Sequence, residues 1–315
     1  MIGPAAVDAG VGLAMVEPTS QRRAESYWRE SAKRLLDNRI GIFCGGVVLA
    51  LAVIAIGAPL ISTYVTHYDP ARQVLADTFL SPSARHPLGT DELGRDTLTR
   101  LLYGARVSLL VAFVTVSLLI FAGGLVGMVA GFYGGIIDQV LMRIVDVILS
   151  VPSIYLLILL TILQPKIGGF KMDPSNPVSL AVIIAIVGWG GLARLVRGEV
   201  LTVKERDFML ATRAMGATGL RLIFVHLLPN VASVMIVAAS LAVGGVILTE
   251  AALDFIGLGI QPPTASWGNM LANSQVYFYH SIWLVVFPGL CIFATVLCMN
   301  IFGNAIRDAF DPRLK

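Results

Sequence analysis

Six long apolar runs dominate this chain of 315 residues and restrict the folds that it can adopt. A helix needs about 20 consecutive apolar residues to cross about 30 Å of hydrocarbon, because each residue adds about 1.5 Å. In lipid, every backbone N–H and C=O must be paired inside the protein, and a helix does this within one segment. We therefore predict an all-α integral membrane protein with six transmembrane helices, at 40–64, 107–130, 136–163, 178–196, 231–253 and 282–301.

The composition supports this prediction. Hydrophobic residues make up 56% of the chain and charged residues 14%, whereas soluble domains have about 25% charged residues. The formal net charge of +3 gives no reason to expect a nucleic-acid partner. Cys44, Cys291 and Cys298 lie within apolar runs and lack the spacing of a metal or redox site. We expect them to be buried small side chains, and we expect no directly bound cofactor.

The basic residues orient the spans, because cytoplasmic segments of membrane proteins are enriched in Lys and Arg. Six spans place both termini on the same side of the membrane. Most of the 23 Lys and Arg residues fall before the first span, between the fourth and fifth spans, or after the sixth. We therefore predict that both termini and the loop between the fourth and fifth spans are cytoplasmic.

This topology divides the chain into four parts. Residues 1–39 form a cytoplasmic tail that lacks the pattern of a signal peptide and ends in an amphipathic interfacial helix at 21–39. Residues 40–106 form the first transmembrane helix and a long external loop. Residues 107–305 form a five-helix core that includes a cytoplasmic loop at 200–228. Residues 306–315 form a cytoplasmic C-terminus.

Three glycines in the second span, Gly123, Gly127 and Gly131, lie four residues apart. This spacing places them on one helix face, where the missing side chains let another helix approach closely. The pattern favours packing within a compact bundle and says little about function.

The spans have few charges near their centres, where a proton- or sodium-coupled carrier needs them. Glu250 and Asp254 lie near the outer end of the fifth span. Arg143 and Asp146, near the inner end of the third span, have the spacing of an ion pair within one helix. The sequence shows no nucleophile with a base partner, no metal triad and no phosphate-binding loop. If the protein does work, the energy for that work is therefore expected from another chain.

The cytoplasmic loop is a candidate attachment point for such a chain. Residues 206–215 suit a short helix, which Gly216 and Gly219 end. A second short helix follows, and Pro229 suits the first turn of the fifth span. Apolar residues on a surface helix are unusual unless a partner covers them. The alternative is a loop that only lies on the membrane.

The same loop resembles the cytoplasmic signature of permease subunits of ATP-binding-cassette (ABC) importers. That signature has a short EAA element, then a glycine, then a Leu-Pro pair. Gly216, Leu228 and Pro229 match it, whereas the EAA positions are Leu210, Ala211 and Thr212. The resemblance implies that the loop docks on an ATPase subunit, through Phe208, Met209, Leu210, Ala211, Thr212, Met215, Gly216, Leu228 and Pro229.

Three other stretches narrow the resemblance to the C-type permeases of oligopeptide, dipeptide and nickel importers. They are PLGTDELGRD at 87–96 with LLYGARVSL at 101–109, GLGIQPPTASWG at 257–268, and RDAFDPRLK at 307–315. Asp254 departs from the small residue expected at its position in that family. The family implies a type I ABC importer permease bundle that imports di- or oligopeptides, with nickel or another small solute as the alternative.

The resemblance also implies partners. These are a second related permease, one or two ABC ATPase subunits that bind ATP and Mg²⁺, an extracytoplasmic substrate-binding protein, and the lipid bilayer. The external loops at 65–95 and 254–281 are expected to face the binding protein, with Pro262, Pro263 and Trp267 as a stiff platform. A loop packed on its own bundle is the alternative for these residues.

Three other functions remain as rivals. An intramembrane enzyme needs a nucleophile and a base within the spans, but the four histidines lie in loops or at span ends. A secondary transporter needs intramembrane charges and inverted repeats. A purely structural membrane subunit is the third rival, and only a functional assay can distinguish it from a permease.

Overall fold

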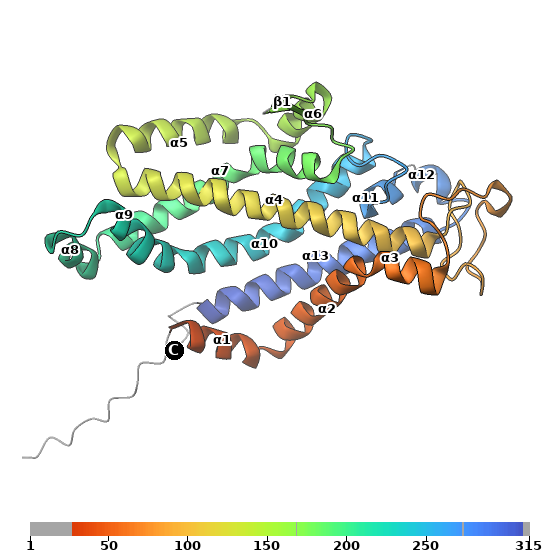
Figure 1. Ribbon diagram of the computed structural model, residues 1–315, viewed down its shortest axis with the longest axis horizontal. Coiled ribbons are helices and arrows are strands. Elements are labelled where there is room, and N and C mark those ends of the chain that lie inside the picture. The colour runs from red at the N-terminus through yellow and green to blue at the C-terminus, as the bar shows by residue number, and fades with distance from the viewer. Residues whose placement is uncertain (1–26, 168, 273, 311–315) are drawn as a thin grey trace, which may run out of the picture.

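The computed structural model describes residues 27–167, 169–272 and 274–310, which form an elongated bundle of helices (Figure 1). The long helices lie side by side along the bundle axis. They are α2 (Arg39–Ile56), α4 (Thr97–Tyr133), α5 (Gly135–Ser150), α7 (Pro177–Lys204), α10 (Leu228–Phe255) and α13 (Trp283–Phe310). Residues 1–26 of the predicted tail at 1–39 and the C-terminal residues 311–315 lie outside the described residues, whereas α1 (Tyr27–Asp37) lies within the helix predicted at 21–39.

Shorter elements connect or flank these helices. Before α4 lie α1 (Tyr27–Asp37), α3 (Ala58–Ile61), the π-helical turn η1 (Ser62–Thr66) and the 3-10 turn η2 (Leu75–Asp77). Between α5 and α10 lie α6 (Ser153–Leu163), an antiparallel pair of two-residue strands β1 (Lys166–Ile167) and β2 (Phe170–Lys171), α8 (Asp207–Ala214), α9 (Gly219–Arg221) and the π-helical segment η3 (Leu222–Leu227). Before α13 lie α11 (Trp267–Met270) and α12 (Ser274–Tyr277).

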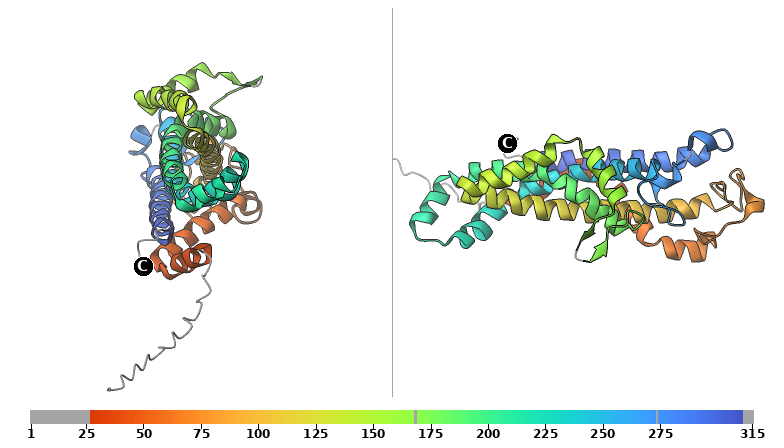
Figure 2. Two further views of the ribbon diagram at one scale, coloured as in Figure 1. Left: turned by 90° about the vertical axis from the view of Figure 1, so that its left-hand side faces the viewer. Right: turned by 90° about the horizontal axis from the view of Figure 1, so that it is seen from above.

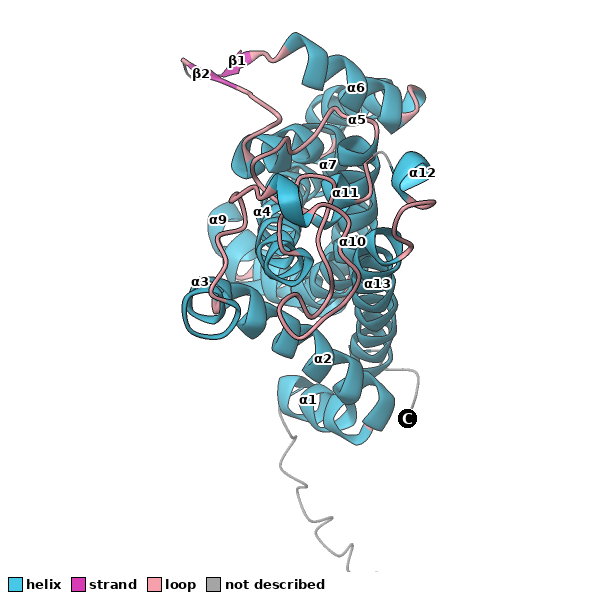
Figure 3. Ribbon diagram, turned by 90° about the vertical axis from the view of Figure 1, so that its right-hand side faces the viewer, coloured by secondary structure: helices cyan, strands magenta, loops and turns pink. Residues whose placement is uncertain are grey.

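The two ends of the bundle differ. Helices α8 and α9 lie at one end, together with α1 and the last turns of α13 (Figure 1). The long connections on either side of α11 and α12, and the connection before α4, gather at the other end (Figure 3). Both ends of the described chain therefore lie at the α8 end.

Helix α4 runs through the middle of the bundle and packs closely along α7. Figure 2 shows α2 and α5 at opposite edges of the bundle, with α4, α7 and α10 between them. A Cβ atom added at Gly123, Gly127 or Gly131 would lie 2.8, 2.5 or 2.8 Å from the nearest atom of α7. The predicted glycine face is therefore a site of packing within the chain, because only glycine permits this approach.

The third predicted span is not a single helix. It is divided into α5 and α6, which are bent by 88°. Pro152 lies at the break, and Val151 before it has an extended backbone (φ −100°, ψ 131°), because a proline disfavours the helical conformation of the preceding residue. Five helical stretches of the described chain are long and apolar enough to cross a membrane, and the bent α5–α6 pair makes a sixth crossing if it is counted as one span.

Other helices are longer than their apolar runs. Helix α4 begins at Thr97, ten residues before the predicted span, and α7 continues to Lys204. Pro229 lies in the first turn of α10, as predicted, but the helical turns of α9 and η3 lead into α10 without a break, so that 219–255 forms one long apolar helix. The widened π-turns of η3 just before Pro229 suit a residue that cannot donate a backbone hydrogen bond.

Candidate functional site

Helix α8 is the short helix that the sequence predicted at 206–215. Asp207 lies in its first turn, where a negative charge suits the positive end of the helix dipole. Met215 ends the helix, and Gly216 follows with a φ of +82°. Glycine adopts this left-handed conformation without steric cost, so Gly216 can reverse the chain towards α9.

One side of α8 packs on the bundle and the other side is exposed. The Met209 side chain is 3% exposed and belongs to a hydrophobic cluster with Val203, Leu222 and Leu227. Met215, by contrast, is 79% exposed. Asp207, Arg213 and Ala214 are also exposed, but we use the name α8 surface for five of the exposed residues, which are Phe208, Leu210, Ala211, Met215 and Gly216.

The predicted docking residues therefore divide into two groups. The α8 surface includes five of them, and Pro229 is also exposed. Met209 is buried and fixes α8 to the bundle, while Thr212 and Leu228 are half-buried. The Thr212 hydroxyl donates a 2.7 Å hydrogen bond to the Phe208 carbonyl oxygen within α8.

The structure also extends the exposed apolar area beyond the predicted residues. Leu220 on α9 and Phe224 and Val225 on η3 are exposed, next to the buried Leu222 and Ile223 of the same turns. The sequence contained this signal as an alternation of inward and outward apolar residues over 220–227, but we predicted only a second short helix there.

Charged contacts attach α5 to α7 near the α8 end. Arg197 donates two hydrogen bonds to the Asp138 carboxylate, at 2.5 and 2.6 Å. Arg194 pairs with Asp146 at 2.5 Å. The predicted pair of Asp146 with Arg143 is wrong, because the partner comes from the neighbouring helix and not from the same one. A sequence pattern within one helix cannot show a partner on another.

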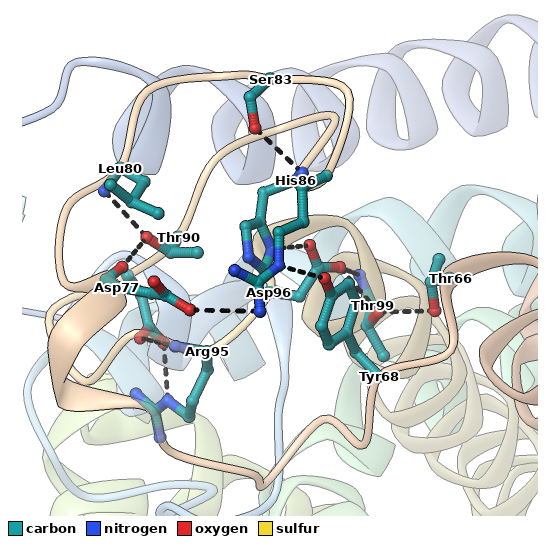
Figure 4. A network of polar contacts seen from close by, with 12 residues as sticks. Thr66, Tyr68, Asp77, Leu80, Ser83, His86, Thr90, Arg95, Asp96 and Thr99 are labelled. Atoms are coloured by element: carbon teal, nitrogen blue, oxygen red, sulfur yellow. Dashed lines mark hydrogen bonds and ion pairs between the residues drawn. The ribbon is translucent and has the colours of Figure 1, made fainter.

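A buried polar network surrounds the start of α4 at the opposite end (Figure 4). Asp96 is the N-cap of α4, and its Oδ2 accepts hydrogen bonds from the Thr99 backbone N–H (2.8 Å) and hydroxyl (2.7 Å). Its Oδ1 lies 3.0 Å from Nδ1 of His86, whose ring stacks on Tyr68. This capping explains why α4 begins well before its apolar run.

Two buried arginines complete this network. Arg95 donates from Nε to Asp91 over 2.6 Å and from Nη2 to Glu92 over 2.7 Å. Arg100 lies 3.3 Å from the same Asp91 carboxylate through Nε. Asp91 also accepts backbone hydrogen bonds from Leu93 and Arg95. These contacts pair the buried charges, as their burial requires.

Two further carboxylates are buried near the end of α10 that lies opposite α8. Glu250 accepts a 3.0 Å hydrogen bond from the Ser108 hydroxyl of α4. Asp254 accepts from the Ile260 backbone N–H at 2.6 Å through Oδ1, and from the Ser266 hydroxyl through Oδ2. Asp254 thus holds the connection that follows α10 against the bundle.

Trp267 requires a correction to the predicted external platform. Its side chain is 1% exposed, and its indole N–H donates a 3.1 Å hydrogen bond to the Leu101 carbonyl oxygen of α4. The packed-loop alternative therefore describes Trp267 in this structure. Pro262 is exposed, as is Pro263, and the peptide bond between them is cis.

These arrangements suit mechanical coupling. The described part of the chain contains no group of three or more His, Cys, Asp or Glu side chains that could hold a metal ion. At one end of a bundle of long apolar helices it has a short helix with exposed apolar side chains. At the other end it has a buried network of hydrogen bonds and ion pairs. Long apolar helices with an exposed helix at one end are the arrangement that the resemblance to permease subunits of ABC importers implies.

The chain belongs to the family of inner membrane components of binding-protein-dependent transport systems, which it matches over residues 123–315. Residues 26–82 match the N-terminal transmembrane domain of oligopeptide transport permease C. The ATPase of such a system is a separate subunit, and the chain is a transport subunit that spans the membrane and not an enzyme.

Relatives match almost the whole chain. A dipeptide transport system permease protein of Alkalihalophilus pseudofirmus is 39% identical, covering 95% of this chain and 94% of the relative. A di/tripeptide transport system permease protein of Pseudomonas aeruginosa is 40% identical over 86% of this chain and 88% of its own. An oligopeptide permease of Bacillus subtilis is 34% identical over 100% of this chain and 97% of its own.

The fold also matches solved structures. An inward-facing structure of the MetNI methionine ABC transporter gives a TM-score of 0.54 at 20% sequence identity, covering 67% of this chain and 96% of the other. A second crystal form gives a TM-score of 0.52 at 19% identity. At this identity the likeness establishes the fold of the permease bundle.

Proposed function

We propose that the chain forms half of the translocation pathway of an ATP-driven importer of di- and oligopeptides. The observation that supports this cargo most directly is that relatives at 34–40% identity over most of the chain are permeases of dipeptide, di/tripeptide and oligopeptide systems. A further relative, 36% identical over 96% of the chain, is a permease for glutathione, which is itself a small peptide. Peptide import is therefore favoured over import of nickel.

The proposed orientation places the α8 end in the cytoplasm. Lys204, Arg206, Arg213 and Arg221 lie at this end, together with the basic residues of α1. An excess of Lys and Arg is typical of the cytoplasmic side. In this orientation both termini are cytoplasmic, and the network around Asp96 lies outside the membrane.

The proposed coupling element is the α8 surface. An ATPase subunit covers Phe208, Leu210 and Met215, which otherwise expose apolar area to water. Met209 packs in one hydrophobic cluster with Val203, near the end of α7, and Leu227, just before α10. A push on α8 is therefore passed to α7 and α10 as whole bodies, because unpaired backbone is not tolerated in lipid.

The proposed complex contains four kinds of partner. A second related permease completes the pathway, one or two ABC ATPases bind ATP and Mg²⁺, and an extracytoplasmic binding protein delivers the peptide. The lipid bilayer surrounds the outer faces of α2 and α5. The connection between α10 and α13, with its exposed Pro262 and Pro263, is the proposed face for the binding protein.

Two measurements test this function. The tagged chain is purified from its native membrane, and mass spectrometry is expected to find a second permease and at least one ABC ATPase. Uptake of labelled dipeptides and of nickel is then compared in cells with and without the gene. Peptide uptake that depends on the chain supports the proposal. Nickel uptake alone, or a chain that purifies without any ATPase, contradicts it.

A further inference from the structure

A cavity of about 290 Å³ lies at the end of the bundle opposite α8. Its walls come from segments that are far apart in the sequence: the connection before α4 and the first turn of α4, the end of α10, the connection at 256–262, the short helices α11 and α12, and the beginning of α13. Its volume is near the lower limit for small-molecule pockets, so it suits a ligand of only a few groups. The side chains that matter below are Glu92, Arg95, Arg100, Asp254 and Tyr277.

The two arginines of this cavity retain unused hydrogen-bond donors. Each is only 3% exposed. Arg95 uses Nε and Nη2 to bind Asp91 and Glu92, while Arg100 uses Nε for Asp91 and Nη1 for a long contact with the Pro70 carbonyl oxygen. Within the described residues, Nη1 of Arg95 and Nη2 of Arg100 make no hydrogen bond. Neither nitrogen is among the buried polar atoms without a partner, so both are accessible and can donate charge-assisted hydrogen bonds to a ligand carboxylate.

Negative charge lines the same cavity. Glu92 is partly exposed, and Asp254, at the end of α10, also lines the cavity. Asp254 accepts hydrogen bonds from the Ile260 backbone N–H and the Ser266 hydroxyl and also contacts Glu250, and its two oxygens together can accept about four hydrogen bonds. The lining has three carboxylates, including Asp91, for two guanidinium groups, so an added ammonium group is also favoured.

Neutral polar groups also line the cavity. The Tyr277 phenol is partly buried and lies near Glu92 and Asp91, and these causes raise its pKa, so it remains a protonated hydroxyl. Gln261 and Ser274 also line the cavity. The lining therefore combines guanidinium donors, carboxylate acceptors and neutral hydrogen-bonding groups, which are the groups that recognise a peptide with two free termini.

We propose that this cavity binds a short zwitterionic peptide, with its carboxylate on the free N–H groups of Arg95 and Arg100 and its ammonium group near Glu92 and Asp254. The cavity would then be a binding site on this subunit that peptide occupies as it enters the transporter. This inference rests on the proposed peptide cargo. It adds that the permease itself recognises the charged ends of the peptide.

The test measures occupation of the cavity directly. The complete transporter, with both permeases and its ATPases, is placed in lipid nanodiscs without nucleotide or binding protein. Ser274→Cys introduces a thiol in the cavity wall, and its rate of reaction with a maleimide is measured. Val276→Cys, on the same short helix but exposed and outside the cavity lining, is the matched control. The parent chain gives the background from its three native cysteines.

The expected result depends on the free termini. Millimolar alanyl-alanine slows labelling of Ser274→Cys at least fivefold, and labelling of Val276→Cys less than twofold. Alanyl-alanine amide and N-acetyl-alanyl-alanine protect at least fivefold less well. Adding Ala272→Phe, which fills space in the cavity lining, abolishes protection by alanyl-alanine.

Three results would overturn the proposal. The first is no protection by any peptide, and the second is equal protection by free and blocked peptides. The third is protection by the added binding protein alone, regardless of peptide, which would assign the cavity to a protein contact. Peptide uptake by the same Ser274→Cys transporter is measured in parallel. If peptide is taken up but does not protect the cysteine from maleimide, only the proposed binding site in the cavity is refuted. If the wild-type transporter takes up no peptide, the proposed function itself is contradicted.

Discussion

Lys204, the last residue of α7, donates a 2.7 Å hydrogen bond from Nζ to the backbone carbonyl oxygen of Phe132 in the last turn of α4. The two residues are 72 positions apart in the sequence. A lysine suits this place, because the last carbonyl groups of a helix lack partners within the helix and form the negative end of its dipole. The bond joins the ends of α4 and α7 directly before the chain turns into α8.

Lys204→Met should weaken the connection between α8 and the bundle. The change removes the donor but keeps an unbranched apolar chain, and a hydrogen bond of this kind stabilises a protein by about 1 kcal/mol. We expect the transporter to assemble, with peptide uptake per ATP hydrolysed reduced two- to fivefold. Lys204→Arg, which retains donors, should restore most of the coupling. Equal uptake per ATP hydrolysed in Lys204→Met and wild type would show that this hydrogen bond does not help to transmit motion from α8 to the bundle.

The position of α8 relative to α9 also depends on a single residue, Gly216. Proline fixes φ near −65° and cannot adopt the +82° found here, so Gly216→Pro should misplace α8 relative to α9. We expect a subunit that reaches the membrane and assembles but loses at least 90% of uptake, while its ATPase continues to hydrolyse ATP. Gly216→Asn should retain activity, because asparagine tolerates positive φ. Wild-type uptake by Gly216→Pro would refute the role of this turn.

The α8 surface should determine whether an ATPase binds. Leu210→Glu and Met215→Glu place a charge in a face that a partner is proposed to cover, and each should weaken the complex by about 1–2 kcal/mol, roughly tenfold in affinity. The ATPase recovered with the purified chain is measured by quantitative mass spectrometry. Leu75→Glu, at an exposed leucine of the opposite end, is the matched control and should have no effect. Undiminished recovery with both α8 variants would place the ATPase contact elsewhere.

Gly127 should be intolerant of any side chain. A Cβ atom there would lie 2.5 Å from the Ala193 carbonyl oxygen and 2.8 Å from the Val196 Cβ, so α4 and α7 must separate. Gly127→Ala is expected to destabilise the subunit by about 1–3 kcal/mol. Thermal unfolding of the purified transporter, followed by the loss of its monodisperse peak, measures this. A Cβ at Gly198 meets nothing within 4 Å, so Gly198→Ala should leave the transition unchanged.

The helices could be predicted from the sequence because lipid imposes strong rules on each segment separately. Long apolar runs identified the membrane-crossing segments, and Gly216 and Pro229 marked local backbone changes that depend on only a few neighbours. The bend at Pro152 was missed, although the proline was visible, because proline is tolerated within many spanning helices. Whether a proline bends its helix by 88° depends on tertiary packing, which the run itself does not show.

The polar structure at the end opposite α8 could not be predicted in the same way. Trp267 is buried by contacts with Leu101 and Ser108, which are 166 and 159 residues away in the sequence. A tryptophan in a connecting segment is equally suited to a core and to an exposed platform, so residue type alone does not decide. Asp146 likewise had a plausible partner in its own helix, and only the packing of α5 on α7 shows that Arg194 is the partner.

Asp254 should control the order of the connection that follows α10. It accepts the Ile260 backbone N–H and the Ser266 hydroxyl, and a Cβ at Gly259 or Gly268 would collide with it, so the chain folds tightly around this carboxylate. Asp254→Ala would leave two donors without their acceptor, at about 1–3 kcal/mol for each buried group. We expect at least tenfold faster hydrogen exchange in peptides covering 256–267, with α8 peptides unchanged as the internal control.

Asp254→Asn separates the shape of this side chain from its charge. The amide retains an oxygen acceptor for Ile260 but presents an NH₂ group to Ser266, whose hydroxyl must then accept a hydrogen bond instead of donating one. Exchange in 256–267 should therefore lie between wild type and Asp254→Ala. If both variants exchange at the wild-type rate, other contacts, such as the packing of Trp267, hold the connection. If Asp254→Asn equals Asp254→Ala, the negative charge is required and the acceptor geometry alone is insufficient.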